Sequence, residues 1–234
     1  MYLRRFKAKL KQRWPGGLFS VSEAKRVNPR AKEYLYRLRK SGEVQKVHRG
    51  WYYIPEKRDV WDFLARDKHF KVLIKQTAAS IWNHDFVHRN VYRLAVENQS
   101  HKNALERFAQ RMGWIFEVEY HPKMPYEYKK IDGLFVEAPE SCIVSCMAEW
   151  AFTNALFTLY LKRNEVNLDK LRQLGRWKRI SGTHTRVWTA IRYGCAMLNE
   201  RLRNSRFKVR AANLKQSDVK ELIEEAVEKV AEFV

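Results

Sequence analysis

Cysteine and glycine are scarce in this chain of 234 residues, which contains only three cysteines and nine glycines. An odd number of cysteines does not fit the paired framework of a small secreted protein and is typical of a chain kept in a reducing cytoplasm. The glycines nowhere form the Gly-x-Gly-x-x-Gly pattern of a dinucleotide-binding loop. We therefore expect a cytoplasmic protein with no disulfide scaffold and no cofactor.

Metal-binding patterns are missing as well. Cys142 and Cys146 lie one helical turn apart, but no third or fourth ligand follows at the spacing of a zinc site. Free cysteine often behaves as a small buried apolar residue. We expect these two cysteines to be part of the core and the chain to bind no metal.

Long apolar runs are limited to residues 142–161, a stretch roughly long enough to cross a bilayer. Glu149 and Asn154 lie in its middle, where an ionised carboxylate would be costly in lipid. We expect one buried helix, or two helices broken near Thr153–Asn154, and no membrane partner. Residues 1–13 alternate charged and apolar side chains, which does not predict a secretory signal.

Acidic residues are also few, since the chain has 26 Asp and Glu but 46 Lys and Arg, which gives a formal net charge of +20. Residues 1–58 carry 17 basic and 4 acidic residues, and residues 152–215 carry 15 and 3. The counts are 12 and 13 in residues 59–151, and 2 and 6 in residues 216–234. An excess of this size affects polyanion binding rather than fold. Nucleic acid is the first partner to expect, ahead of a membrane surface or an acidic protein.

Three helices are predicted within the first forty residues. Apolar residues recur at helical spacing over residues 1–14, at Leu3, Phe6, Leu10 and Trp14. Ser20 and Glu23 have the spacing of a capping box, which predicts a short helix to about Val27. Asn28-Pro29 predicts the end of that helix and the start of the next, with Asn28 as the cap.

The helix predicted over residues 29–40 has two different faces. Ala31, Leu35 and Leu38 form an apolar stripe. The opposite face carries Arg30, Glu33, Tyr36, Arg37 and Lys40, and Lys32 and Arg39 lie beside it. Two strand-like runs follow, Glu43–Val47 and Trp51–Pro55, joined through His48-Arg49-Gly50 as a hairpin. This order of elements predicts a winged helix-turn-helix over residues 1–58.

Such a module lays its second helix in the major groove of DNA. Arg30 and Arg37 suit the bidentate recognition of guanine, while Tyr36 and Lys40 are better placed for phosphate. Glu33 either accepts a hydrogen bond from cytosine or holds Arg37 in an i,i+4 ion pair. The predicted DNA contacts on the helix and on the wing are Arg30, Lys32, Glu33, Tyr36, Arg37, Lys40, Lys46, His48 and Arg49. RNA binding and protein docking are the alternatives.

The same residues carry a resemblance to a known family. Leu18–Ala24, Tyr34–Val44 and Val47–Pro55, with Arg49-Gly50-Trp51-Tyr52 after Gly42, resemble the N-terminal winged helix of AbiEi-type antitoxins. Residues 131–140, which end in Pro139-Glu140, resemble a strand of that family, and residues 76–80 followed by 91–96 resemble a helix-then-strand unit. The resemblance implies a transcriptional regulator, and an antitoxin that represses its own operon and binds a cognate toxin.

Residues 59–234 predict an α+β domain, mixed α/β at first and helical afterwards, because strands fall mainly in residues 70–136 and only helices follow from residue 140 to 233. The predicted strands are 70–75, 91–97, 114–120 and 131–136. The predicted helices are 60–67, 78–84, 102–112, 140–163, 167–175, 184–203 and 216–233. Apolar residues on one stripe of the last helix, from Val219 to Phe233, either close the core or meet a second copy in a homodimer, and we favour the core.

An enzyme is the second hypothesis. Asp132 and Glu137, placed on one predicted strand, resemble the metal-binding carboxylates of a nuclease, but Pro139 stands where that constellation needs lysine. Arg179 and His184 have the Arg-x4-His spacing of some helical RNases, although Gly182 predicts a loop between them. We therefore expect no catalytic residues. The basic charge of residues 162–215 indicates either solvated helix surfaces or an extended contact with a polyanion.

Overall fold

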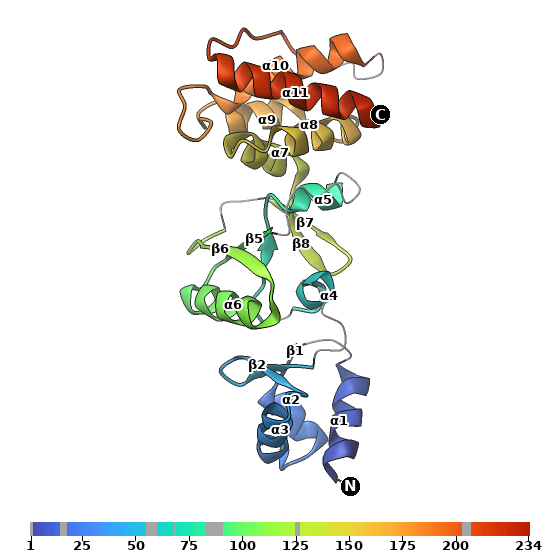
Figure 1. The fold of residues 1–234 in the computed structure, drawn as a ribbon. Helices are drawn as coiled ribbons and strands as arrows, with labels where there is room; N and C mark the ends of the chain where they lie inside the picture. Colours follow the sequence, from blue (N-terminus) through green and yellow to red (C-terminus); the bar gives the residue numbers. More distant parts are fainter. Residues whose placement is uncertain are drawn as a thin grey trace. The chain divides into compact units, whose positions relative to one another are not determined.

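A computed structural model describes residues 2–14, 18–54, 60–67, 69–82, 91–124, 127–202 and 207–234. The fold is α+β, as the sequence predicts, with helices along the chain and two sheets (Figure 1). The chain divides into two compact units. Unit 1 comprises Met1–Ile74, Asn90–Pro125 and Lys130–Val136, and unit 2 comprises Lys75–Arg89, Tyr126–Lys129 and Glu137–Val234. The predicted division after residue 58 does not coincide with a limit of these units and stays a prediction.

Three helices begin unit 1: α1 (Tyr2–Arg13), α2 (Val21–Val27) and α3 (Ala31–Lys40). The predicted capping box of α2 is confirmed, because the Glu23 amide donates to Ser20 Oγ over 3.1 Å and the Ser20 amide donates to Glu23 Oε2 over 2.7 Å.

The start of α3 differs from the prediction. The amide of Arg30 donates to Asn28 Oδ1 over 2.8 Å, so Asn28 closes a turn and also caps the end of α2. The helix therefore begins at Ala31, two residues later than predicted, with Arg30 as its N-cap residue.

A core of its own holds these three helices together. The apolar stripe of α1, with Phe6 and Leu10, packs against that of α3, with Ala31, Leu35 and Leu38. All five residues are buried, which confirms the predicted inward faces. The other buried members of this cluster are Phe19, Ala24, Tyr34, Val44 and Ile54.

A small antiparallel sheet completes this part of unit 1, with β1 (Leu18–Ser20), β2 (Gln45–His48) and β3 (Trp51–Tyr53) in the order β1-β3-β2. β2 and β3 are shorter than predicted, and Pro55 lies outside the described residues. Their connection is Arg49-Gly50, where Gly50 has a φ of 78° that favours glycine. β1 was not predicted, because three residues are too few to form a recognisable pattern.

Most of the rest of unit 1 belongs to a five-stranded mixed sheet with the order β6-β5-β4-β8-β7, in which part of β7 and the last residue of β8 are assigned to unit 2. Its strands are β4 (Leu73–Ile74), β5 (Val91–Val96), β6 (Ile115–Tyr120), β7 (Tyr128–Ile131) and β8 (Leu134–Glu137). Two helices accompany it, α4 (Val60–Ala65) and α6 (Gln99–Met112), and α6 packs against β5 and β6. Tyr53 of β3 contacts Phe63 and Phe108 edge-on, with ring centroids 5.6 and 5.8 Å away.

The single strand predicted over residues 131–136 is wrong. The structure has a hairpin there, because Asp132 and Gly133 form the turn between β7 and β8 with φ values of 47° and 89°. Asp-Gly is a strong turn signal for this left-handed geometry. A Cβ atom on Gly133 would also lie 2.8 Å from the carbonyl oxygen of Ala65.

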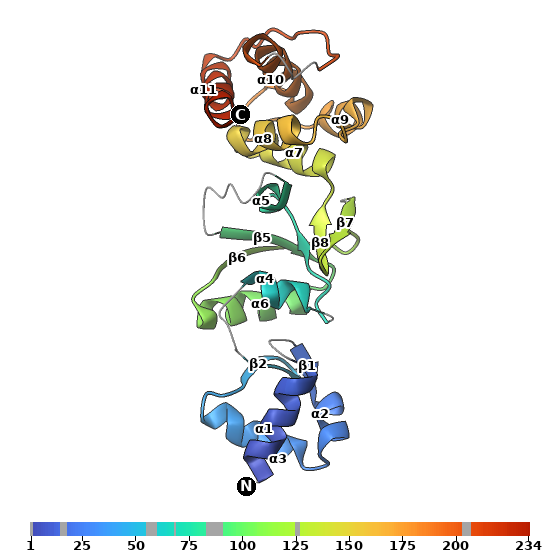
Figure 2. The same ribbon diagram turned by 90° about the vertical axis from the view of Figure 1, so that its right-hand side faces the viewer.

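Unit 2 is helical, with α7 (Pro139–Ala148), α8 (Phe152–Leu161), α9 (Leu168–Gly175), α10 (Val187–Arg201) and α11 (Ser217–Phe233). It also contains α5 (Ala78–Trp82), and the remainder of the helix predicted over 78–84 lies outside the described residues. α7 and α8 form one layer, and α10 and α11 form another against it (Figure 2). Val219, Ile223 and Val230 of α11 are buried in unit 2, whereas Leu222 and Phe233 are exposed.

The apolar stretch 142–161 forms parts of two buried helices. The break lies at Glu149–Ala151, where Trp150 has a φ of 61°, and not at Thr153–Asn154 as predicted. Cys142 and Cys146 are free and buried, as expected of core residues. None of the helices that the structure describes is long and apolar enough to cross a membrane.

Candidate nucleic-acid interface

The polar face of α3 points away from the core of unit 1. Because Ala31, Leu35 and Leu38 are buried, the helix is rotated so that its other side is open to solvent. The predicted contacts on this helix are all exposed: Arg30, Lys32, Glu33, Tyr36, Arg37 and Lys40. Arg39 is exposed as well. The structure therefore brings the six predicted residues together on one surface, with five cationic side chains when Arg39 is included.

Two local contacts order this face. Arg37 Nη2 lies 2.7 Å from Glu33 Oε1, and the two side chains remain 60% and 48% exposed. An exposed pair of this kind contributes only a few tenths of a kcal/mol. Tyr36 is 52% exposed, and its ring centroid lies 5.8 Å from Arg39 Cζ and 5.7 Å from Lys40 Nζ. Of the two roles predicted for Glu33, the structure contains the ion pair with Arg37.

The three residues predicted to contact DNA from the wing, Lys46, His48 and Arg49, differ in how far they are exposed to solvent. Arg49 is exposed at the tip of the β2–β3 hairpin, and Lys46 is half-buried. His48 instead turns toward His69 and His101. Its Nδ1 atom lies 3.3 Å from His69 Nε2, and its ring centroid lies 5.7 Å from that of His101.

Two histidines of this cluster, His48 and His69, have lowered pKa values. Burial, followed by the nearby charges of His101 and His48, lowers the pKa of His69 to about 4. Burial and then the charges of His101, Arg107 and Lys46 lower the pKa of His48. The neutral form of His48 therefore predominates at pH 7, and the positive charge of the hairpin comes from Lys46 and Arg49.

Sequence reasoning missed two further cations beside the hairpin. Arg107 and Arg111 of α6 line a groove of about 570 Å³ together with Lys46 and Arg49. Arg111 Nη2 donates to the carbonyl oxygen of Lys46 over 2.7 Å, which fixes the helix against β2. Arg107 and Arg111 belong to residues 59–151, which carry 12 basic and 13 acidic residues, so the net charge of that segment does not reveal them. Their i,i+4 spacing, which puts both on one helix face, was the available signal.

The predicted nuclease pairs are not assembled. Asp132 is exposed in the β7–β8 turn, while Glu137 is fully buried at the far end of β8. At about 3.3 Å per residue, β8 separates their carboxyl groups by roughly 10 Å or more. Glu137 Oε1 accepts a hydrogen bond from Ser145 Oγ over 2.8 Å, and within the described ranges no three His, Cys, Asp or Glu residues are grouped to hold a metal.

The second pair lies on a loop. Arg179 and His184 are both exposed and precede α10, which begins at Val187 rather than at residue 184 as predicted. Gly182 between them has a φ of 71°, as expected for the loop that its neighbours predict.

Comparisons with known proteins bear on the fold. No protein-family model and no curated protein matches the sequence. Among solved structures, the chain resembles the crystal structure of the RV2827C protein from Mycobacterium tuberculosis, with a TM-score of 0.53 and 10% sequence identity. The match covers 99% of this chain and 80% of that chain. At this level of identity the similarity concerns the fold alone, and it agrees with the α+β class.

Proposed function

We propose that residues 1–58 form a winged helix-turn-helix domain and that the chain is a sequence-specific regulator of transcription that binds double-stranded DNA. In this proposal α2 and α3 are the helix-turn-helix, and the β2–β3 hairpin is the wing. The observation that carries it is the division of α3 between a buried apolar stripe and an exposed cationic face. The separate core around α1, α2 and α3 supports a folding unit of this kind.

The dimensions of α3 suit the major groove. An α-helix with its side chains is about 10–12 Å across, and the major groove of B-DNA is about 12 Å wide. The ten residues of α3 span about 15 Å along the helix axis. Arg37 lies toward the C-terminal half of the exposed face, and its ion pair with Glu33 is weak enough to exchange for guanine at small cost. Tyr36 and Lys40 are then placed for the flanking phosphates.

The wing and α6 extend the proposed footprint. Lys46 and Arg49 of the hairpin stand beside Arg107 and Arg111 of α6 around one groove. Together with the cations of α3 they account for five to eight phosphate contacts. Because each contact releases condensed counterions, log K should then fall with log salt concentration with a slope of roughly −4.5 to −7.

Charge reversal on α3 tests the proposal. A duplex selected from a random pool with the unaltered protein serves as the probe, and binding is followed by fluorescence anisotropy. Arg37→Glu together with Lys40→Glu should weaken binding at least a hundredfold, since each good base contact contributes about 1–3 kcal/mol and like charge repels phosphate. The thermal midpoint should hardly change, because both side chains are exposed.

Lys220→Glu together with Lys229→Glu is the matched control. It makes the same change in net charge on α11 of unit 2, where both lysines are roughly half exposed and pair with glutamates. The control should bind the duplex nearly as tightly as the unaltered protein. Retention of full affinity by the α3 variant would show that α3 does not read DNA.

The resemblance to AbiEi-type antitoxins extends the proposal to autoregulation, with a cognate toxin as protein partner and a homodimer as the DNA-binding form. A regulator of this kind binds the promoter of its own operon. We expect tighter binding to the region upstream of its own gene than to a coding fragment of equal length and base composition. Equal affinity for the two fragments would contradict autoregulation without contradicting duplex binding.

A further inference from the structure

A second cationic site lies entirely within unit 2. A groove of about 690 Å³ is lined by α9, by the start of α10 and by the segment around residue 209. Its cationic lining residues are Arg172, Arg176, Arg186, Arg192, Lys208 and Arg210, and its aromatic ones are Trp177 and Trp188. Asp169 is the acidic residue of this lining.

Trp177 is the unusual feature of this groove. It is 70% exposed, although large aromatic side chains are normally mostly buried. Two guanidinium groups lie near the ring, with Arg176 Cζ at 5.2 Å and Arg186 Cζ at 5.4 Å from its centroid. An exposed indole ring among cations is the combination that binds unpaired bases, which stack on the ring while the backbone contacts the charges.

Backbone contacts on both sides hold the segment that carries Trp177 in place. α9 approaches α10 closely at Gly175, where a Cβ atom would lie 3.2 Å from the Trp188 amide nitrogen. After Trp177, the carbonyl oxygen of Lys178 accepts a hydrogen bond from the Val187 amide over 2.9 Å. These contacts tie the short segment that carries Trp177 to the first turn of α10.

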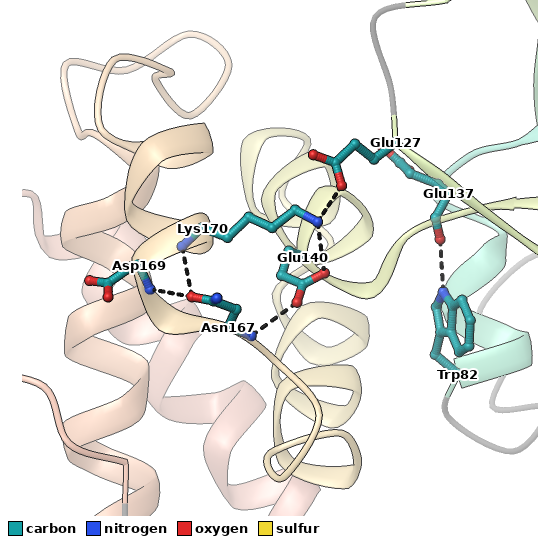
Figure 3. A network of polar contacts seen from close by, with 7 residues as sticks. All are labelled: Trp82, Glu127, Glu137, Glu140, Asn167, Asp169 and Lys170. Atoms are coloured by element: carbon teal, nitrogen blue, oxygen red, sulfur yellow. Dashed lines mark hydrogen bonds and ion pairs between the residues drawn. The ribbon is translucent and has the colours of Figure 1, made fainter.

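A polar network fixes the other end of α9 (Figure 3). The side-chain oxygen of Asn167 accepts from the Asp169 and Lys170 amides over 3.0 and 3.1 Å. The backbone N–H of Asn167 in turn donates a hydrogen bond to Glu140 Oε1 over 2.9 Å. Lys170 pairs with Glu127 and lies 3.9 Å from Glu140, and its hydrogen bond to Glu127 raises the pKa of Lys170. α9 therefore presents Arg172 and Arg176 from a fixed position.

The opposite wall of the groove is held along α10. Arg192 donates from Nε to the Arg210 carbonyl over 2.6 Å and from Nη2 to the Ala211 carbonyl over 2.8 Å. Asn199 forms two hydrogen bonds with the backbone of Phe207, over 2.8 and 2.7 Å. Arg192 thus acts as a structural residue, and the side chains of Lys208 and Arg210 remain exposed.

The cations around Trp177 lack acidic partners. Across the described part of the chain, no ion pair involves Arg172, Arg176, Arg186, Lys208 or Arg210. Like charges repel one another, and surface cations are usually interspersed with anions. Five unpaired cations gathered around one groove therefore favour an anionic ligand over a merely solvated surface.

We propose that this groove binds single-stranded nucleic acid, with an unpaired base stacked on Trp177 and backbone phosphates bound by Arg172, Arg176, Arg186, Lys208 and Arg210. A duplex does not meet this chemistry, because its bases are stacked on one another and offer no free face. An acidic protein segment would use the cations but not the exposed flat ring beside them. The site is separate from the duplex contact proposed for α3 and does not depend on it.

Fluorescence anisotropy with labelled single strands tests the proposal on the full chain. The probes are a twelve-residue oligodeoxyuridylate, the matching oligouridylate, and the selected duplex. Trp177→Ala should weaken the binding of a single strand between about fivefold and a hundredfold, and Trp177→Phe should restore most of it. Comparison of the two single strands tells whether the ligand is DNA or RNA, because only RNA carries the 2′-hydroxyl.

Control variants separate this site from the other one. Phe233→Ala removes an equally exposed aromatic residue from α11 and should leave single-strand binding unchanged. Arg37→Glu with Lys40→Glu should lose the duplex and keep the single strand, whereas Trp177→Ala should do the reverse. Failure of one proposal is thus distinguishable from failure of the other.

The contradicting results are equally defined. Single strands that do not bind the unaltered protein at 50 mM salt would overturn the proposal. Equal binding by Trp177→Ala, or competition by polyglutamate as strong as by unlabelled oligonucleotide, would show that the groove recognises charge alone and would overturn it too. Circular dichroism of Trp177→Ala should match that of the unaltered protein, because the side chain is exposed.

Discussion

Glu140 is the residue whose replacement tests most sharply how α9 is held. The side chain is buried in the first turn of α7, and its Oε1 atom accepts the Asn167 amide over 2.9 Å. In Glu140→Ala the backbone N–H of Asn167, the N-cap residue of α9, loses this acceptor, which costs about 1–2 kcal/mol. We expect a loss of this size in the local stability of α9. The favourable interaction of the Glu140 carboxylate with the N-terminus of its own helix, about 0.3–1 kcal/mol, is lost from α7 and not from α9.

Hydrogen exchange followed by mass spectrometry measures that loss directly. Amides in residues 167–175 should exchange about five- to thirtyfold faster in Glu140→Ala, since each tenfold corresponds to 1.4 kcal/mol. Glu140→Gln is the matched control because it keeps the volume and an acceptor oxygen but loses the charge near Lys170. Its effect should stay below about 1 kcal/mol. Equal exchange in the two variants would refute the assignment of the loss to the hydrogen bond.

Three further outcomes are expected. Because the pKa of His69 is lowered to about 4 in the folded state, the protein should lose stability as the pH falls from about 6.5 to 4. His69→Phe keeps a ring stacked on Trp51 and should weaken this pH dependence. Urea unfolding followed by fluorescence measures the effect. Gly133→Ala should lower the free energy of unfolding by more than 2 kcal/mol or so, because Gly133 has a φ of 89° and the Ala65 carbonyl lies close to it. Gly182→Ala is the control and should cost about 1 kcal/mol, because Gly182 has a φ of 71° but no atom within 4 Å of an added Cβ. Equal shifts of the thermal midpoint in the two variants would contradict this. Duplex binding measured between 50 and 200 mM salt should give the slope of roughly −4.5 to −7, and a slope near zero would exclude phosphate contacts.

Features specified by a few neighbouring residues could be predicted from the sequence. The capping box of Ser20 and Glu23 and the buried stripe of Ala31, Leu35 and Leu38 depend on contacts three or four residues apart. The α+β class also followed from the order of the patterns. These features depend on local hydrogen bonds and on helical periodicity, which the sequence contains directly.

Features that depend on distant segments could not be predicted in the same way. The groove beside the hairpin joins Lys46 to Arg111, and the groove in unit 2 joins Trp177 to Arg210. Neither pairing has a sequence signature, because tertiary packing brings the residues together. The break between α7 and α8 lies at Glu149–Ala151 and was predicted at Thr153–Asn154, because an apolar run indicates burial but not where a buried helix ends.

Methylation interference on the selected duplex tests whether α3 lies in the major groove. A methyl group on guanine N7 lies in the major groove and blocks an arginine that would bind there. We expect strong interference at guanine N7. The interference at one guanine should be lost in Arg37→Ala, while Arg201→Ala on α10 should leave the pattern unchanged. Interference confined to adenine N3 in the minor groove, or a pattern identical in Arg37→Ala, would contradict the placement of α3 in the major groove.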